Sequence, residues 1–181
     1  MADPGKTALI VIDMLNTYEH DDAEPLRESV RPILPTFERL LARARDSSSL
    51  LVYVNDNYGR WHDGPAELID RAAGGPYREL VEPIAPPPET PFVVKARHSI
   101  FYQTPLEYLL RDEGVSRLVL TGQVTEQCVL YSALDAYVRH FDVAVCRDAV
   151  AAIDPALAEA ALVMMGRNMH AEITETADCR L

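Results

Sequence analysis

Short apolar runs alternate along this chain with longer segments in which apolar residues recur every three or four positions. The short runs are mostly valine, isoleucine and leucine, and they cover 8–13, 50–54, 92–95, 117–122, 142–146 and 171–174. Strands that are buried on both faces of a sheet need such continuous hydrophobicity. The pattern therefore predicts six strands of a parallel sheet that helices cover on both faces.

The longer segments carry the start signals and the interruptions that are typical of helices. Segment 23–46 has an apolar stripe, but Pro32 and Pro35 lie inside it and predict a helix that begins late or is kinked. Asp154 directly before Pro155 predicts a capped helix start. We expect helices between the strands.

The regular alternation of strands and helices predicts one α/β domain over residues 1–181, built as a three-layer α/β/α sandwich. The length suits a single domain of ordinary size. Residues 55–91 interrupt the alternation with an irregular stretch that is rich in glycine and proline and contains Trp61. Because long connections inside a compact domain are usually functional, we expect a binding loop or lid there.

The acidic composition narrows the choice of partners and location. The chain has 17 lysines and arginines against 28 aspartates and glutamates, a formal charge of −11, and no basic cluster. Nucleic acids and anionic membranes need a basic patch, so neither is expected as a partner. The first apolar run ends at Asp13 and no basic region precedes it, which argues against a signal peptide or membrane span. Three widely spaced cysteines, Cys128, Cys146 and Cys179, suit a reducing cytoplasm.

Three reactive residues follow strands of the predicted sheet. Asp13 closes the first strand, Lys95 closes the third, and Cys128 follows the fourth after one tight turn. Ligands bind beyond the carboxyl ends of strands in an open parallel sheet, and an acid, an amine and a thiol at that edge can perform acyl transfer. Each residue alone also has an ordinary structural interpretation, as a turn cap, a solvated amine and a buried thiol. The catalytic interpretation is favoured because all three residues lie at the same edge of the predicted sheet.

The position of Cys128 suggests how its thiol could be activated. If Thr125 is the N-cap of the next helix, Cys128 lies in the first turn, near backbone N–H groups that lack helical partners. Those amides and the helix dipole favour a thiolate, and the Lys95 ammonium would lower the thiol pKa further. The same amides could hold the oxyanion of a tetrahedral intermediate.

Three segments together resemble one protein family. The stretches "ALIVIDMLNTY", "VVKARHSIFYQTPLEYLL" and "LVLTGQVTEQCVLYSALDAYVRHFDVAVCRDAVAA" resemble the isochorismatase-like cysteine hydrolases, which include nicotinamidases and N-carbamoyl amidohydrolases. The resemblance covers most of the chain in the order and spacing of the family. It implies a Rossmann-like, six-stranded parallel sheet of order 3-2-1-4-5-6 and a catalytic triad of Asp13, Lys95 and Cys128.

The resemblance also implies details around the triad. A non-proline cis peptide bond would fall at Val124–Thr125 and would turn the amides of Thr125 and Cys128 toward one oxygen. A homodimer or higher homo-oligomer is expected, and no cofactor.

The chain departs from the family pattern in places that bear on chemistry. Nicotinamidases bind a metal through Asp-x-His and a further histidine, whereas residues 55–58 here read Asn-Asp-Asn-Tyr, with His62 beyond. Tyr58 in place of the histidine removes a strong ligand, so neither a metal site nor the nicotinamidase assignment is expected. Isochorismatases proper commonly lack the cysteine, so Cys128 favours hydrolysis of an amide or imide over cleavage of a vinyl ether.

Aromatic residues near the same edge are candidates for binding the substrate. Tyr18, Tyr58, Trp61 and Tyr102 are interpreted as pocket walls, although aromatic residues are equally common in cores and interfaces. Arg97 could bind an acidic substrate or have a structural role. The five histidines show no metal-ligand spacing.

These observations favour a cysteine-dependent hydrolase that cleaves a C–N bond of a small amide, ureide or carbamoyl substrate through a thioester. Two alternatives stay open: vinyl-ether hydrolysis in which Asp13 acts as the acid, and a non-catalytic α/β binding domain. A redox-sensing thiol is disfavoured because no second cysteine lies near Cys128 in the sequence. The identity of the small-molecule substrate is not encoded in any motif.

Overall fold

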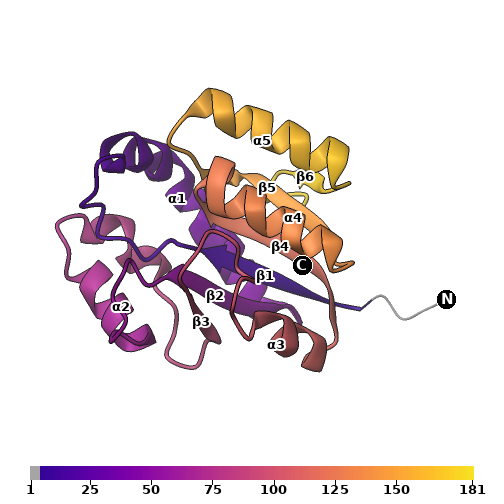
Figure 1. The fold of residues 1–181 in the computed structure, drawn as a ribbon, viewed down its shortest axis with the longest axis horizontal. Helices are drawn as coiled ribbons and strands as arrows, with labels where there is room; N and C mark the ends of the chain where they lie inside the picture. The colour runs from indigo at the N-terminus through magenta and orange to yellow at the C-terminus, as the bar shows by residue number, and fades with distance from the viewer. Residues whose placement is uncertain (1–4) are drawn as a thin grey trace.

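The computed structural model describes residues 5–181 and is built around one sheet (Figure 1). Its six strands are parallel and lie in the order β3-β2-β1-β4-β5-β6, which confirms the predicted fold class. The strands are β1 (Lys6–Ile12), β2 (Leu50–Asp56), β3 (Phe92–Lys95), β4 (Val115–Gln123), β5 (Asp142–Ala151) and β6 (Glu172–Thr174).

Helices cover both faces of this sheet. The helical elements are α1 (Ala23–Asp46), α2 (Pro65–Ala73), α3 (Leu106–Asp112), α4 (Leu130–Val138), α5 (Pro155–Asn168), the short 3-10 helices η1 (Arg78–Leu80) and η2 (Glu82–Ile84), and one π-helical turn, η3 (Thr125–Val129). Helices α3, α4 and α5 pack into one hydrophobic cluster, and α1, α2, η1 and η2 pack into the other. Figure 1 shows the resulting three layers.

Successive residues of β1 explain why the strands are continuously apolar. Leu9 and Val11 belong to the cluster with α1, whereas Ile10 and Ile12 belong to the cluster with α3, α4 and α5. All four side chains are buried, because successive side chains of a strand point to opposite faces. A strand with helices on both sides therefore needs apolar residues at every position.

Helix α1 differs from its prediction, since it begins at Ala23 and runs without a break through Pro32 and Pro35. Both prolines lie on the exposed side of the helix. The carbonyl groups that lose their helical partners there can be hydrated, so the local cost of each proline is reduced. The buried stripe, which includes Leu34 and Phe37, holds the helix against the sheet.

The irregular stretch between β2 and β3 is more ordered than the sequence indicates. It contains α2, η1 and η2, and the side chains of Leu80, Val81 and Ile84 are fully buried against the α1 face. The Tyr53 hydroxyl donates a hydrogen bond to the Ile84 carbonyl at 2.7 Å. These side chains therefore anchor the segment in the packed core.

Within residues 5–181, no helix combines the length and the apolar character that crossing a membrane requires.

Candidate active site

Four polar residues mark the carboxyl ends of four neighbouring strands. Asp13 follows β1, Asp56 is the last residue of β2, Lys95 is the last residue of β3, and Gln123 is the last residue of β4. Because the strands are parallel, these ends lie along one edge of the sheet, where the order reverses between β1 and β4. This is the edge at which open α/β sheets bind ligands.

Gly122 allows β4 to approach β1 closely just before the site. Its φ is +106°, a backbone conformation that residues with a side chain rarely adopt. A Cβ atom at this position would lie 2.1 Å from the carbonyl oxygen of Ile12, the residue before Asp13. Glycine is therefore required here by both the backbone angle and the space.

Asp13 is held by hydrogen bonds from two directions. Its carboxylate Oδ1 accepts the backbone N–H of Asp56 at 2.7 Å, and its backbone N–H donates to the Val54 carbonyl at 3.0 Å. The Gln123 side chain donates Nε2–H to the Asp13 carbonyl at 2.7 Å. The carboxylate is buried and fixed in one orientation, with Oδ2 left for other partners.

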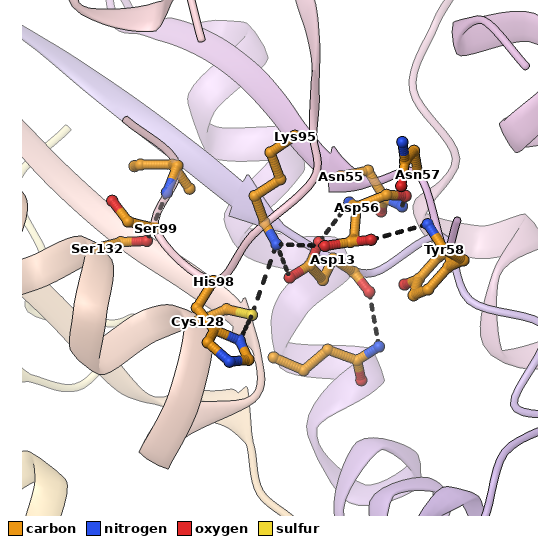
Figure 2. A network of polar contacts seen from close by, with 12 residues as sticks. Asp13, Asn55, Asp56, Asn57, Tyr58, Lys95, His98, Ser99, Cys128 and Ser132 are labelled. Carbon is orange, nitrogen blue, oxygen red and sulfur yellow. Dashed lines mark hydrogen bonds and ion pairs between the residues drawn. The ribbon is translucent and has the colours of Figure 1, made fainter. Parts of the chain in front are cut away.

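Lys95 connects the acid to the thiol, as Figure 2 shows. Its side chain is buried, and Nζ lies 2.8 Å from Asp13 Oδ2 and 3.4 Å from Asp56 Oδ2. The same ammonium lies 3.6 Å from Cys128 Sγ. The structure thus brings the three residues Asp13, Lys95 and Cys128 together around one nitrogen atom.

Cys128 lies in the π-helical turn between β4 and α4, and not in the first turn of an α-helix. Val124 is the residue before this turn, and the Thr125 hydroxyl donates to the Ala151 carbonyl at 2.9 Å. The predicted N-cap at Thr125 is therefore wrong, because the end of β5 binds its hydroxyl.

The cis peptide bond lies at Gln123–Val124, one residue before the predicted Val124–Thr125. The reason is that β4 extends through Gln123, so the chain leaves the sheet at that bond. The amides of Thr125 and Cys128 both belong to the turn that follows, and their use as an oxyanion site stays a prediction.

Burial dominates the electrostatics of the three residues. It raises the pKa of the Cys128 thiol to about 12, with the Asp13 charge adding to the shift and Lys95 only partly opposing it. Burial likewise raises the pKa of Asp13, despite the neighbouring ammonium. Burial alone would lower the pKa of Lys95, but the charges of Asp13 and Cys128 outweigh it and raise that pKa. The expectation of a lowered thiol pKa is wrong, and at neutral pH the thiol keeps its proton and the amine its charge.

Two cavities meet beside these residues. The inner cavity, of about 330 Å³, has Asp13, Gln123, Gln127 and Cys128 among its lining residues. The outer cavity, of about 700 Å³, is lined by residues of the β2 and β3 ends and the loops that follow them, among them Arg60, Trp61, Lys95, Arg97, His98 and Tyr102. Asp56 and Tyr58 line both cavities, so the two lie next to each other.

The four aromatic residues predicted as pocket walls lie in different environments. Trp61 and Tyr102 are exposed and line the outer cavity. Tyr58 is also exposed and lines both cavities. Tyr18 lines neither cavity, because its ring is buried and its hydroxyl donates to Gln123 Oε1 at 3.4 Å. The prediction that Tyr18 is a pocket wall is therefore wrong; it is a buried residue that forms a hydrogen bond with the Gln123 side chain.

Three residues at the site were not predicted from the sequence to lie beside the triad. Asp56 and Gln123 end strands as Asp13 and Lys95 do, and the same rule about strand ends identifies them. His98 lies three residues after Lys95, with its imidazole Nδ1 3.8 Å from Cys128 Sγ. No spacing signal identifies His98, since only the fold brings its loop to the thiol.

The nicotinamidase-type metal position does not fit this chain. Asp56 Oδ1 accepts the Tyr58 backbone N–H at 2.8 Å, and Asp56 Oδ2 faces the Lys95 ammonium. A metal ion bound by this carboxylate would lie next to a buried positive charge. Over residues 5–181, no group of three or more histidine, cysteine, aspartate or glutamate side chains is arranged to hold a metal ion.

Comparisons with known proteins agree with this geometry. The family model of the isochorismatase domain matches residues 7–178. The uncharacterized isochorismatase family protein YaaI of Bacillus subtilis (strain 168) is 33% identical over 167 residues, which cover 92% of each chain. Maleamate amidohydrolase of Pseudomonas putida is 31% identical over 153 residues, which are 80% of this chain and 72% of the relative.

Solved structures give the same result. The crystal structure of N-carbamoylsarcosine amidase from Thermoplasma acidophilum superposes with a TM-score of 0.73 at 28% identity, over 97% of this chain and 99% of that one. The matched family model covers nearly the whole sheet and every residue of the site described above. The chain therefore belongs to the isochorismatase family of hydrolases, with amidohydrolases that act on non-peptide C–N bonds among its relatives.

Proposed function

We propose that this protein is a cysteine-dependent hydrolase that cleaves a C–N bond of a small amide, ureide or carbamoyl substrate. The observation that carries the proposal is the position of Lys95 Nζ, 2.8 Å from Asp13 Oδ2 and 3.6 Å from Cys128 Sγ, beside the inner cavity. A maleamate amidohydrolase and an N-carbamoylsarcosine amidase among the relatives support C–N cleavage as the reaction class.

In the acylation step, Asp13 takes the proton of the Cys128 thiol and Sγ attacks the substrate carbonyl carbon. The backbone amides of Thr125 and Cys128 stabilise the oxyanion of the tetrahedral intermediate. Asp13 then returns its proton to the substrate nitrogen, the C–N bond breaks, and the amine leaves. The product of this step is a thioester on Cys128.

In the deacylation step, Asp13 takes a proton from a water molecule, and the resulting hydroxide attacks the thioester carbonyl. The C–S bond breaks, the acid leaves, and the proton on Asp13 returns to the sulfur. The raised pKa of both Asp13 and Cys128 suits this exchange, because each group can hold the proton in turn. Lys95 keeps its charge throughout and balances the negative charge that moves between the two.

The test is a serine substitution of the nucleophile combined with a substrate panel. Small amides, ureides and carbamoyl acids are incubated with the protein, ammonia or amine release is measured, and the mass of Cys128 is followed for a trapped acyl group. Cys128→Ser should keep the fold and lower turnover by about 10³-fold or more. Cys179→Ser, the same change at a cysteine away from the site, should keep turnover.

Near-normal turnover in Cys128→Ser would contradict a thioester mechanism and favour vinyl-ether hydrolysis by Asp13. Binding of panel compounds without any product would favour a non-catalytic binding domain. The small-molecule partner, the homo-oligomer and the cytoplasmic location remain predictions from the sequence.

A further inference from the structure

His98 faces the thiol from the side opposite the other two site residues. Its imidazole Nδ1 lies 3.8 Å from Cys128 Sγ, and Lys95 Nζ lies 3.6 Å from the same sulfur. Figure 2 shows the ring on the side of Cys128 that points away from Lys95 and Asp13. His98 is exposed and lines the outer cavity, whereas Cys128 lines the inner one.

The loop that carries His98 is attached to α4, the helix that continues directly from the turn of Cys128. The backbone N–H of Ile100 donates to Ser132 Oγ at 3.1 Å, and the hydroxyl of Ser99 bonds to the Asp135 carboxylate. The His98 ring also packs against the ring of Tyr131 with 5.4 Å between centroids. The imidazole is therefore positioned relative to the sulfur, although its surface is exposed.

The formal charges around the Cys128 thiol do not balance. Two carboxylates, Asp13 and Asp56, face one ammonium, Lys95. When the thiol proton moves to Asp13, the thiolate and Asp56 still carry two negative charges against one positive charge. One negative charge stays uncompensated in a buried site, in keeping with a thiol pKa that burial and Asp13 raise.

The other charged groups around His98 do not supply this compensation. Arg97 precedes His98 and lines the outer cavity. In the described residues 5–181, the polar side-chain contacts of Cys128 Sγ are with Lys95 and His98, and Arg97 makes none. Asp135, on α4, is already bound by Ser99 and by Arg139, whose nitrogen lies 2.7 Å from its carboxylate.

We propose that His98, in its protonated form, is a second cation of the active site and a catalytic residue that stabilises the Cys128 thiolate. The proposal deepens the proposed function, because it rests on Cys128 acting as the nucleophile. No proton leaves His98 in this role; the proton of the thiol still goes to Asp13. The reactivity of the thiol should thus be enhanced at pH values where histidine is charged, and the enhancement should disappear as the pH rises.

The experiment measures alkylation of Cys128 by iodoacetamide, with peptide mass spectrometry to separate it from the other two cysteines. The rate for the unaltered protein is divided by the rate for His98→Asn and for His98→Phe, the second of which keeps an aromatic ring against Tyr131. The ratio should be about tenfold near pH 6 and should approach one near pH 9, since an opposite charge at this distance shifts the thiol pKa by roughly one unit or more and the imidazole carries that charge only in its protonated form.

A lysine at the same position keeps the charge at both pH values. His98→Lys should therefore react about as fast as the unaltered protein near pH 6 and faster near pH 9. His62→Asn, at an exposed histidine of the neighbouring loop, is the matched control and should follow the unaltered protein.

A ratio that grows as the pH rises would overturn the proposal and identify His98 as a base. A ratio of one at every pH would also overturn it. Because alkylation needs no substrate, failure of the substrate panel would leave this result standing, and failure of the alkylation test would leave Cys128→Ser as an independent test of the hydrolase.

Discussion

At the residue scale, the protonation of Cys128 links chemistry to stability. Burial, followed by the Asp13 charge, raises the pKa of the folded thiol to about 12, whereas the unfolded thiol has its ordinary pKa of 9.0. A raised pKa in the folded state means that the folded protein keeps a proton that the unfolded chain loses. The thiol therefore contributes stability below about pH 9 that is lost as the pH rises toward 12.

We expect Cys128→Ala to reduce the loss of stability at alkaline pH. Between about pH 9 and pH 11, the unaltered protein should lose up to roughly 1.4 kcal/mol per pH unit through this one group, and the alanine variant should lose correspondingly less. Urea unfolding at several pH values measures the difference. Parallel pH profiles for the two proteins would mean that the thiol ionises as easily in the folded site as in the unfolded chain.

At the element scale, the close approach of β4 to β1 determines where Asp13 and Gln123 lie. Both residues adjoin the point where Gly122 meets Ile12, and the pairing of β4 with β5 shifts register between Leu120 and Gly122. A change at Gly122 thus acts on the two strand ends that frame the site.

Gly122→Ala should destabilise the fold by about 2–5 kcal/mol, because a new Cβ would overlap the Ile12 backbone and the φ is positive. Gly114→Ala is the matched control, since its φ is +69° but no atom lies within 4 Å of the added Cβ. It should cost only the backbone strain, about 1 kcal/mol. Thermal or urea unfolding of both variants measures the difference, and equal losses would show that the overlap is relieved by a small shift of β1.

The strands were predictable from sequence because burial on both faces leaves a pattern that needs no knowledge of neighbours. The strand order was predicted from the family resemblance. The positions of Asp13 and Lys95 at strand ends were predicted from the apolar runs themselves. The course of α1 through Pro32 was not predictable, since it depends on which side of the helix faces solvent. The contact between His98 and Cys128 was not predictable from the sequence either. It depends on tertiary hydrogen bonds of Ser99 and Ser132, which attach the loop of His98 to α4.

At the scale of the whole molecule, the charge distribution around the outer cavity differs from the acidic surface. The chain carries a formal charge of −11, and most of its described arginines pair with a carboxylate or bind another acceptor. Over residues 5–181, Arg60 and Arg97 make no ion pair or side-chain hydrogen bond, and both line the outer cavity. Two uncompensated cations beside the active site favour a substrate with a negative group.

We expect the protein to prefer an amide that carries a carboxylate over a neutral amide of the same size. Arg60→Gln and Arg97→Gln should each raise KM for the anionic amide by roughly twofold to fivefold, the effect of one exposed ion pair, and leave kcat nearly unchanged. KM for the neutral amide should not change. Added salt should reduce the difference, because it screens exposed charges over about 10 Å at 0.1 M.

Arg167→Gln separates this local effect from the change in net charge. Arg167 is an exposed arginine in the last turn of α5, lines neither cavity, and likewise has no ion pair among the described residues. The three variants alter the total charge equally, so steering by the whole molecule would raise KM alike in all of them. A rise confined to Arg60→Gln and Arg97→Gln would locate the recognition of the anion in the outer cavity, whereas an equal rise in all three would contradict it.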